Sequence, residues 1–121
     1  MKATTFVPET GDLVWVDFDP QKGREQSGRG LALVLSPAEY NSVVGLFVVC
    51  PVAAKIKGYP FEVPLPPGSK IKGAVLADHI KSLDWRRGSA ELAVRLDRDG
   101  ALLHEVRIRL RPLLGFDFTQ R

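Results

Sequence analysis

Short apolar stretches that end at glycine, proline or a polar turn constrain the fold of this chain more than any other feature of its sequence. Their lengths and their β-branched and aromatic residues are typical of β-strands. Strands are predicted at 13–18, 31–35, 46–52, 59–63, 74–77 and 90–96. Residues 81–85 either extend the fifth strand or start another. The continuously apolar strand 31–35 should be buried on both faces, Trp15 should lie in the core, and Pro51 should lie at the end or the edge of its strand.

One segment near the C-terminus has the periodicity of a helix, 98–114. At 100° per residue, its apolar side chains fall within one arc of about 120°: Leu102, Leu103, Val106, Leu110, Leu113 and Leu114. Asp97 is a candidate N-cap, and Pro112 is tolerated only near the end of such a helix. Ile108 lies almost opposite the apolar arc and is either an ordinary exposed side chain or part of a second contact surface. A single helical turn is predicted at 37–42, with Ser36 as its cap.

These patterns together predict a mainly β fold, a small barrel or curled sheet that is closed by a C-terminal helix. The 121 residues are enough for one domain, spanning 1–121. The chain is 45% apolar and 26% charged, which is typical of a globular protein, and its net charge of +3 is compatible with a nucleic-acid partner. One cysteine, Cys50, excludes a disulfide framework and a cysteine-built metal site, and its apolar neighbours predict burial.

The sequence offers no signal for a membrane or for export. No apolar run approaches the roughly 20 residues that a membrane-spanning helix needs. The first residues, Met1–Thr5, lack the apolar core of a signal peptide. A cytoplasmic location without membrane attachment is therefore the expectation.

The polar segment 19–30 is longer than a hairpin connection requires, which is about 2–5 residues. It carries a carboxylate, an amide and two guanidinium groups, at Glu25, Gln26, Arg24 and Arg29. Cutting RNA without a metal needs a group that takes a proton, a group that gives one, and a cation that stabilises the charged phosphorus centre. A carboxylate beside arginines can supply these functions. The same loop is equally consistent with a surface that binds an acidic peptide.

Several motifs resemble those of the MazF/PemK/Kid toxins of type II toxin–antitoxin systems. They cover nearly the whole chain, in the family's order, at 11–20, 23–28, 34–37, 57–63 and 76–86. The resemblance implies an SH3-like small barrel of the PemK/Kid/CcdB type with a C-terminal helix, working as a homodimer. It further implies a cofactor-free, metal-independent mRNA interferase, a toxin that causes growth arrest in a stress response. Such an enzyme cuts single-stranded mRNA at a specific sequence, leaving 2′,3′-cyclic phosphate and 5′-OH ends. A MazE-like antitoxin with a flexible acidic tail would occupy the RNA groove and inhibit it.

The resemblance also assigns site residues. Glu25 matches the position expected to do acid–base work, and Arg29 is the candidate for stabilising the phosphate. The candidate RNA-binding residues are Phe18, Gln26, Lys57, His79 and Arg86. Phe18 and Gln26 match groove-lining positions, and Lys57 and Arg86 are candidates for phosphate contacts. His79 is a candidate for reading a base edge or supplying a proton. For Phe18 a place in the core is the alternative, for His79 a structural role, and for the charged side chains solvent exposure.

Two departures from the family pattern leave a second interpretation open. The family's catalytic arginine aligns with Gly30, so that Arg29 comes one residue early and, in an extended chain, on the opposite face. Ala53 stands where relatives commonly have Thr or Ser. The loss of one catalytic donor typically costs about a hundredfold in rate. The alternative is therefore a catalytically impaired member that binds RNA or antitoxin without efficient cleavage.

A gyrase poison of the CcdB kind, which shares the barrel, is a third reading. That activity depends on a C-terminal Trp-Gly-Ile, whereas this chain ends with residues 118–121, Phe-Thr-Gln-Arg.

Overall fold

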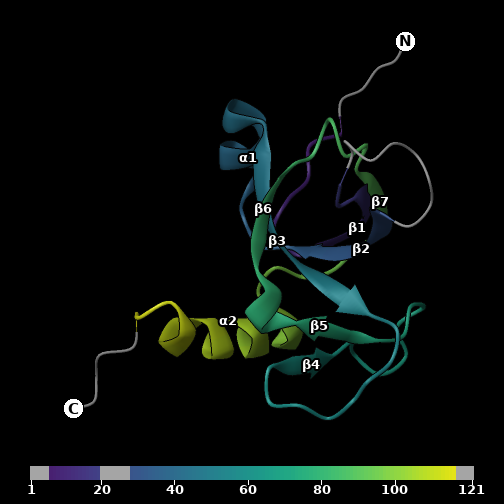
Figure 1. The fold of residues 1–121 in the computed structure, drawn as a ribbon, viewed down its shortest axis with the longest axis vertical. Coiled ribbons are helices and arrows are strands. Elements are labelled where there is room, and N and C mark those ends of the chain that lie inside the picture. The colour runs from purple at the N-terminus through teal and green to yellow at the C-terminus, as the bar shows by residue number, and fades with distance from the viewer. Residues whose placement is uncertain (1–5, 20–27, 117–121) are drawn as a thin grey trace.

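The computed structural model describes residues 6–19 and 28–116 (Figure 1). Its elements in chain order are β1 (Asp12–Asp17), β2 (Arg29–Val34), α1 (Ala38–Val44), β3 (Leu46–Ala53), β4 (Glu62–Pro64), β5 (Ala74–Leu76), the 3₁₀ helix η3 (Ala77–His79), β6 (Lys81–Asp84), β7 (Glu91–Arg95) and α2 (Ala101–Leu113). The predicted fold class is confirmed, because a seven-stranded antiparallel sheet is the main element of the described chain and one C-terminal helix packs against it. No helix in these residues is long and apolar enough to cross a membrane.

The sheet is organised around β3. The strand order is β4-β5-β3-β2-β1-β7, and β6 also pairs with β3. On one side β3 pairs with β2, and on the other side its residues 46–49 pair with β6 whereas residues 52–53 pair with β5. One strand therefore has two groups of neighbours, the β1–β2–β7 group and the β4–β5 group, and the first lies above the second in Figure 1.

Pro51 lies inside β3, not at the end or on an edge strand as the sequence predicted. The amide and carbonyl of Val48 both face the β2 side, where they contact Ser36 Oγ and the Leu35 amide. Backbone groups alternate in direction along a strand, so the nitrogen of Pro51 faces the other side. There it falls between the residues paired with β6 and those paired with β5. The missing N–H of proline therefore costs the sheet no hydrogen bond.

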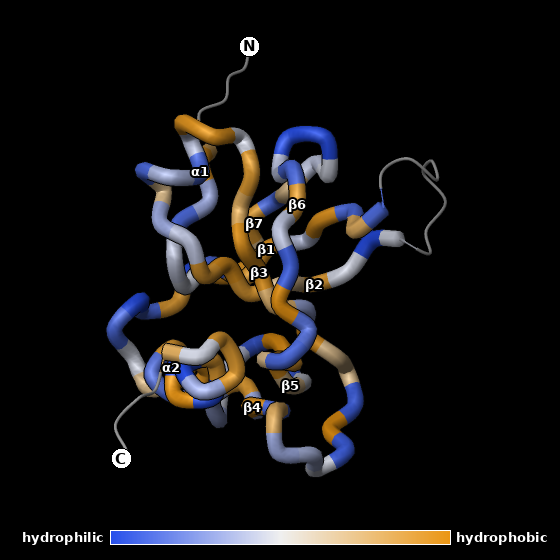
Figure 2. The backbone as a smooth tube through the Cα atoms, turned by 60° about the vertical axis from the view of Figure 1, so that its left-hand side comes forward, coloured by the Kyte–Doolittle hydropathy of each residue, from blue (hydrophilic) through white to orange (hydrophobic). Residues whose placement is uncertain are grey.

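Both faces of the central strands are buried. Alternate residues of β1 and β2 enter a first cluster beneath α2, which contains Leu13, Leu33, Val75, Leu103 and Val106. The intervening residues enter a second cluster on the opposite face, containing Val14, Ala32, Phe47, Val49 and Trp85. Figure 2 shows this hydrophobic character along the central strands and on α2. The predicted two-sided burial of β2 is thus confirmed for residues 31–34.

Trp15 is not a core residue, contrary to expectation, since 42% of it is exposed. It lies on the same face of β1 as Leu13 but is not part of the first cluster. α2 buries the predicted residues Leu102, Leu103, Val106 and Leu110, whereas Leu113 and Leu114, which follow Pro112 at the helix end, are exposed. Ile108 is also partly exposed.

Three predictions about where an element begins or how it is capped are wrong, because local hydrogen bonds compete with the expected element. α2 begins at Ala101, not Arg98, because Asp97 accepts bonds from the amides of Asp99 and Gly100 and forms a turn. Ser36 does not cap α1; its hydroxyl donates to Asn41 Oδ1 and accepts from the Val48 amide. The fourth strand begins at Glu62, because residues 59–61 turn.

The segment 81–85 forms a strand of its own, β6, which covers Lys81–Asp84. It does not extend the fifth strand, because η3 intervenes after β5.

An ion pair to a buried carboxylate ties β1 to β7. The Asp12 side chain is fully buried, and the Arg95 guanidinium donates two hydrogen bonds to it, at 2.7 and 2.9 Å. Hydrogen bonding and the charge of Asp12 raise the pKa of Arg95. The Glu9 amide is a further donor to Asp12, at 3.0 Å. A carboxylate in this position depends on these donors because burial without them is costly.

We expect Arg95→Ala to lower the free energy of unfolding by about 2 kcal/mol, less than a fully buried pair would cost because Arg95 is partly solvated. Arg98→Ala is the matched control, since Arg98 pairs with the partly exposed Glu9 at 3.5 Å and should cost less than about 1 kcal/mol. Urea denaturation of the two variants measures both values. Equal losses would contradict a special contribution from the Asp12 pair.

Cys50 is fully buried, as the sequence predicted. Burial, with a smaller contribution from the nearby charge of Asp78, raises the pKa of its thiol to about 12. The thiolate is the reactive form of cysteine. We therefore expect iodoacetamide to label the native protein more than about a hundredfold more slowly than the urea-unfolded chain at mildly alkaline pH. Mass spectrometry of timed samples measures the rates, and rapid labelling of the native protein would contradict the buried position.

Candidate functional site

A pocket of about 240 Å³ lies at the C-terminal end of β3. Its lining residues are Ala53, Lys55, Lys57, Tyr59, Glu62, Leu76 and His79. Three segments meet here because β5 pairs with both β3 and β4, which brings the end of β3, the turn before β4 and η3 together. The pocket thus contains two predicted RNA-binding residues, Lys57 and His79, and the position of the missing hydroxyl, Ala53.

The acidic groups around this pocket are engaged by the protein itself. The Tyr59 hydroxyl donates to the Asp78 carboxylate, at 2.9 and 3.1 Å, and this hydrogen bond raises the pKa of Tyr59. Burial by itself would raise the pKa of Glu62, but hydrogen bonds from the amides of residues 57–59 outweigh it, so that this pKa lies below its ordinary value. Two lysines and His79 also line the pocket; the His79 side chain is half exposed, and its Nε2 atom lies 3.8 Å from Asp78 Oδ1. Because the basic side chains face the pocket and the acidic ones are hydrogen-bonded within the protein, the site favours a negatively charged ligand.

Phe18, which follows β1, and Lys81, the first residue of β6, lie beside each other. The Lys81 ammonium lies 5.4 Å from the centre of the Phe18 ring, which is a cation–π contact. Phe18 packs against the second cluster but is only partly buried, so part of the residue remains at the surface. A Cβ at Gly30 would lie 3.2 Å from Phe18 Cε2. A side chain at position 30 would therefore project toward the Phe18 ring.

Arg29 is directed to other partners. In the β1–β2 register Arg29 lies opposite Asp17, one residue from the pair formed by Gly30 and Val16. Its guanidinium donates to Asp17 Oδ1 at 3.3 Å, and to Glu91 Oε1 and the Ser89 carbonyl at 2.9 Å. A role for Arg29 at a phosphate remains a prediction, and it would require the guanidinium to exchange these partners.

The remaining predicted residues lie elsewhere. The Arg86 guanidinium stacks over Trp85, at 4.4 Å from the ring centre, and Arg86 does not line the pocket at the end of β3. Glu25 and Gln26 lie outside the described residues. Sequence reasoning did not single out Lys55, Tyr59, Glu62 and Lys81. The motif 57–63 contained Tyr59 and Glu62, but no local pattern indicated that the Glu62 carboxylate would accept hydrogen bonds from the amides of residues 57–59.

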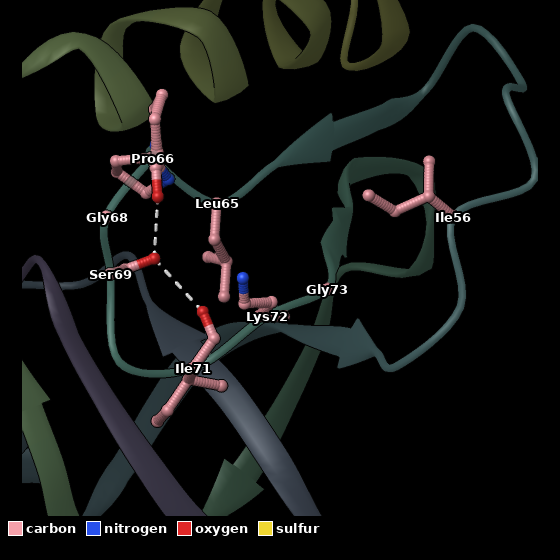
Figure 3. A pocket seen from close by; sticks show the side chains of 9 residues that line it. Ile56, Leu65, Pro66, Gly68, Ser69, Ile71, Lys72 and Gly73 are labelled. Atoms are coloured by element: carbon pink, nitrogen blue, oxygen red, sulfur yellow. Dashed lines mark hydrogen bonds between the residues drawn. The ribbon is translucent and has the colours of Figure 1, made fainter.

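A second hollow, of about 180 Å³, lies beside the turn that connects β4 and β5 (Figure 3). Its lining is mainly apolar, with Ile56, Leu65 and Ile71. The Ser69 hydroxyl is used within the turn, where it contacts the carbonyls of Pro66 and Ile71. This hollow therefore offers little chemistry. Within residues 6–19 and 28–116, no three His, Cys, Asp or Glu side chains are grouped so that they could bind a metal ion.

The chain is similar to proteins of one toxin family. Residues 9–114 match the family model of the PemK-like, MazF-like toxin of type II toxin–antitoxin systems. The endoribonuclease toxin MazF of Escherichia coli K12 is 51% identical over 111 residues, which is 91% of this chain and 96% of that protein. The crystal structure of MazF from Deinococcus radiodurans superposes with a TM-score of 0.80 at 54% identity, covering 92% of this chain and 99% of that chain.

A MazE–MazF complex from Deinococcus radiodurans matches equally well, with a TM-score of 0.80 and 49% identity over 93% of this chain and 100% of that chain. The family match covers most of the chain, and the identity to the curated relative extends over nearly its full length. The chain therefore belongs to the PemK/MazF family of type II toxin–antitoxin toxins, as an endoribonuclease-type member.

Proposed function

We propose that this chain is a toxin that cuts single-stranded mRNA at a specific sequence, without a metal ion, to leave 2′,3′-cyclic phosphate and 5′-OH ends. The observation that supports it most is the pocket at the end of β3, where Lys55, Lys57 and His79 face a ligand while the neighbouring carboxylates are engaged internally. Such a site suits the phosphates and base edges of a single strand. The attacking group is the ribose 2′-OH, so DNA should not be cut.

Each group then has a chemical task. The lysine ammonium groups attract the phosphates, and Phe18 offers a ring on which a base can stack. His79 reads a base edge or moves a proton. Glu25 takes the proton from the 2′-OH, and Arg29 supplies the cation at the phosphorus if its guanidinium leaves Asp17 and Glu91. Gln26 and Arg86 complete the contacts to the strand.

We also propose that a MazE-like antitoxin inhibits the toxin by laying a flexible acidic tail over the lysines of the pocket. Support comes from the MazE–MazF complex, whose toxin chain is 49% identical to this one, and from the net charge of +3. The working form is proposed to be a cytoplasmic homodimer.

The second candidate function is that of an impaired member that binds RNA or antitoxin but cuts RNA inefficiently. Specific observations favour it: position 30 has no side chain to project toward Phe18, Ala53 brings no hydroxyl to the pocket, and Arg29 is bound elsewhere. The two functions predict the same binding and differ in the rate of cleavage.

Incubation of the chain with a long single-stranded RNA in excess EDTA tests the first function. We expect discrete cuts that carry 2′,3′-cyclic phosphates, and no cuts in DNA of the same sequence. Glu25→Ala should lower the cleavage rate by about a hundredfold or more, because the proton acceptor is lost. Glu39→Ala, which removes an exposed carboxylate from α1, is the control and should cut normally. Normal cleavage by Glu25→Ala would exclude that residue from the chemistry.

Gly30→Arg and Ala53→Thr separate the two functions. If the chain is impaired, Gly30→Arg should raise the cleavage rate by about a hundredfold, because the guanidinium would reach the Phe18–Lys81 face after a small shift of the Phe18 ring. Ala53→Thr should add a smaller gain. High activity of the unmodified chain, with no gain in Gly30→Arg, would rule out the impaired function. In that case, loss of activity in Arg29→Ala would show that Arg29 supplies the cation.

A further inference from the structure

Glu62 is the first residue of β4, and its buried side chain contacts the turn that precedes this strand. Only 7% of the residue is exposed, yet it carries no ion pair among the described residues. Its Oε1 atom accepts hydrogen bonds from three consecutive amides, those of Lys57 at 3.0 Å, Gly58 at 2.6 Å and Tyr59 at 3.2 Å. Converging amides of this kind bind anions. Here the anion is internal, so a phosphate from outside cannot use these donors and must be met by side chains.

The rest of the turn is joined to distant elements. The Pro60 carbonyl accepts from Arg109 of α2, and the Phe61 carbonyl accepts from the Ala77 amide of η3. The Tyr59 hydroxyl bonds to Asp78, the neighbour of His79. Glu62 therefore accepts hydrogen bonds from residues 57–59 of the turn, and Phe61, near the end of the same turn, is hydrogen-bonded to η3. The turn that carries Lys57 and the 3₁₀ helix that carries His79 form one connected rim of the pocket.

We propose that Glu62 is a positioning residue for RNA, whose buried carboxylate holds the turn at 57–59 so that Lys57 and Tyr59 stand at the pocket opposite His79. The inference rests on the proposed RNA-binding function and deepens it. It also predicts an unusual direction for the change in RNA affinity. Removing a negative charge beside an anion site should strengthen RNA binding by electrostatics alone, whereas loss of positioning should weaken it.

The test measures the affinity of a short fluorescent single-stranded 2′-O-methyl RNA of random sequence, which cannot be cut because its 2′-oxygen is blocked. Glu62→Ala should bind this probe about tenfold more weakly, as expected for the loss of one charge-assisted contact. Glu62→Gln should stay within about threefold of the unmodified chain, because the amide oxygen can accept the same N–H bonds. Glu39→Ala, the loss of a carboxylate on α1, should bind no more weakly than the unmodified chain.

A pair of glycine variants tests the turn without touching the carboxylate. Gly58 has φ of +89° and Gly68 has φ of +82°, and a Cβ at either position would meet no atom within 4 Å. Alanine therefore imposes the same backbone strain at both positions, but Gly68 lies in the turn between β4 and β5 (Figure 3). We expect Gly58→Ala to weaken the probe's binding and Gly68→Ala to leave it unchanged. Lys57→Ala should weaken binding in the unmodified chain and add little to Glu62→Ala, since both changes remove the same contact.

Several outcomes would overturn the assignment of Glu62. These are unchanged or tighter binding by Glu62→Ala, equal effects of the two glycine variants, and full additivity of Lys57→Ala with Glu62→Ala. If the unmodified chain binds the probe and shows the expected pattern but does not cut unmodified RNA, the nuclease function fails while the role of Glu62 stands. If it does not bind the probe, the assignment of Glu62 fails, and the cleavage assay on unmodified RNA alone decides the nuclease function.

Discussion

The structure depends on β3 having three partner strands. Its side chains alternate between the two core clusters, with Cys50 in the first and Phe47 and Val49 in the second. Its outer side changes from β6 to β5 at Pro51, where no amide is available to bond. Because β3 has to satisfy both neighbours, its C-terminal end at Ala53 is held between β5, the turn before β4 and η3. The position of the pocket follows directly from this arrangement.

Successive side chains of β2 point to opposite faces of the sheet, and this alternation matters most for the proposed function. Arg29 and Gly30 are adjacent in sequence, but the chemistry available to them is different. Arg29 joins Asp17, Glu91 and the 88–89 turn at the β1–β7 side of the sheet, whereas position 30 faces Phe18. A displacement of one residue in an extended chain thus moves a cation from one surface to another. Under the proposed function, the efficiency of RNA cleavage depends on that displacement.

Internal use of carboxylates explains the electrostatic character of the site. Glu62 is bound by backbone amides and Asp78 by the Tyr59 hydroxyl. The two acids therefore serve the shape of the pocket, and its basic side chains remain for a ligand. The proposed proton acceptor, Glu25, belongs to another segment, the long polar loop.

The sequence by itself determined the order of the strands along the chain, the buried face of α2 at Leu102, Leu103, Val106 and Leu110, and the family, because these depend on local periodicity and on motifs. It also indicated Lys57 and His79. Only the tertiary structure decided that Trp15 is exposed and that Lys55, Tyr59 and Glu62 join the site. These features depend on hydrogen bonds and packing between segments far apart in the chain, such as Arg109 to Pro60, which no local pattern encodes.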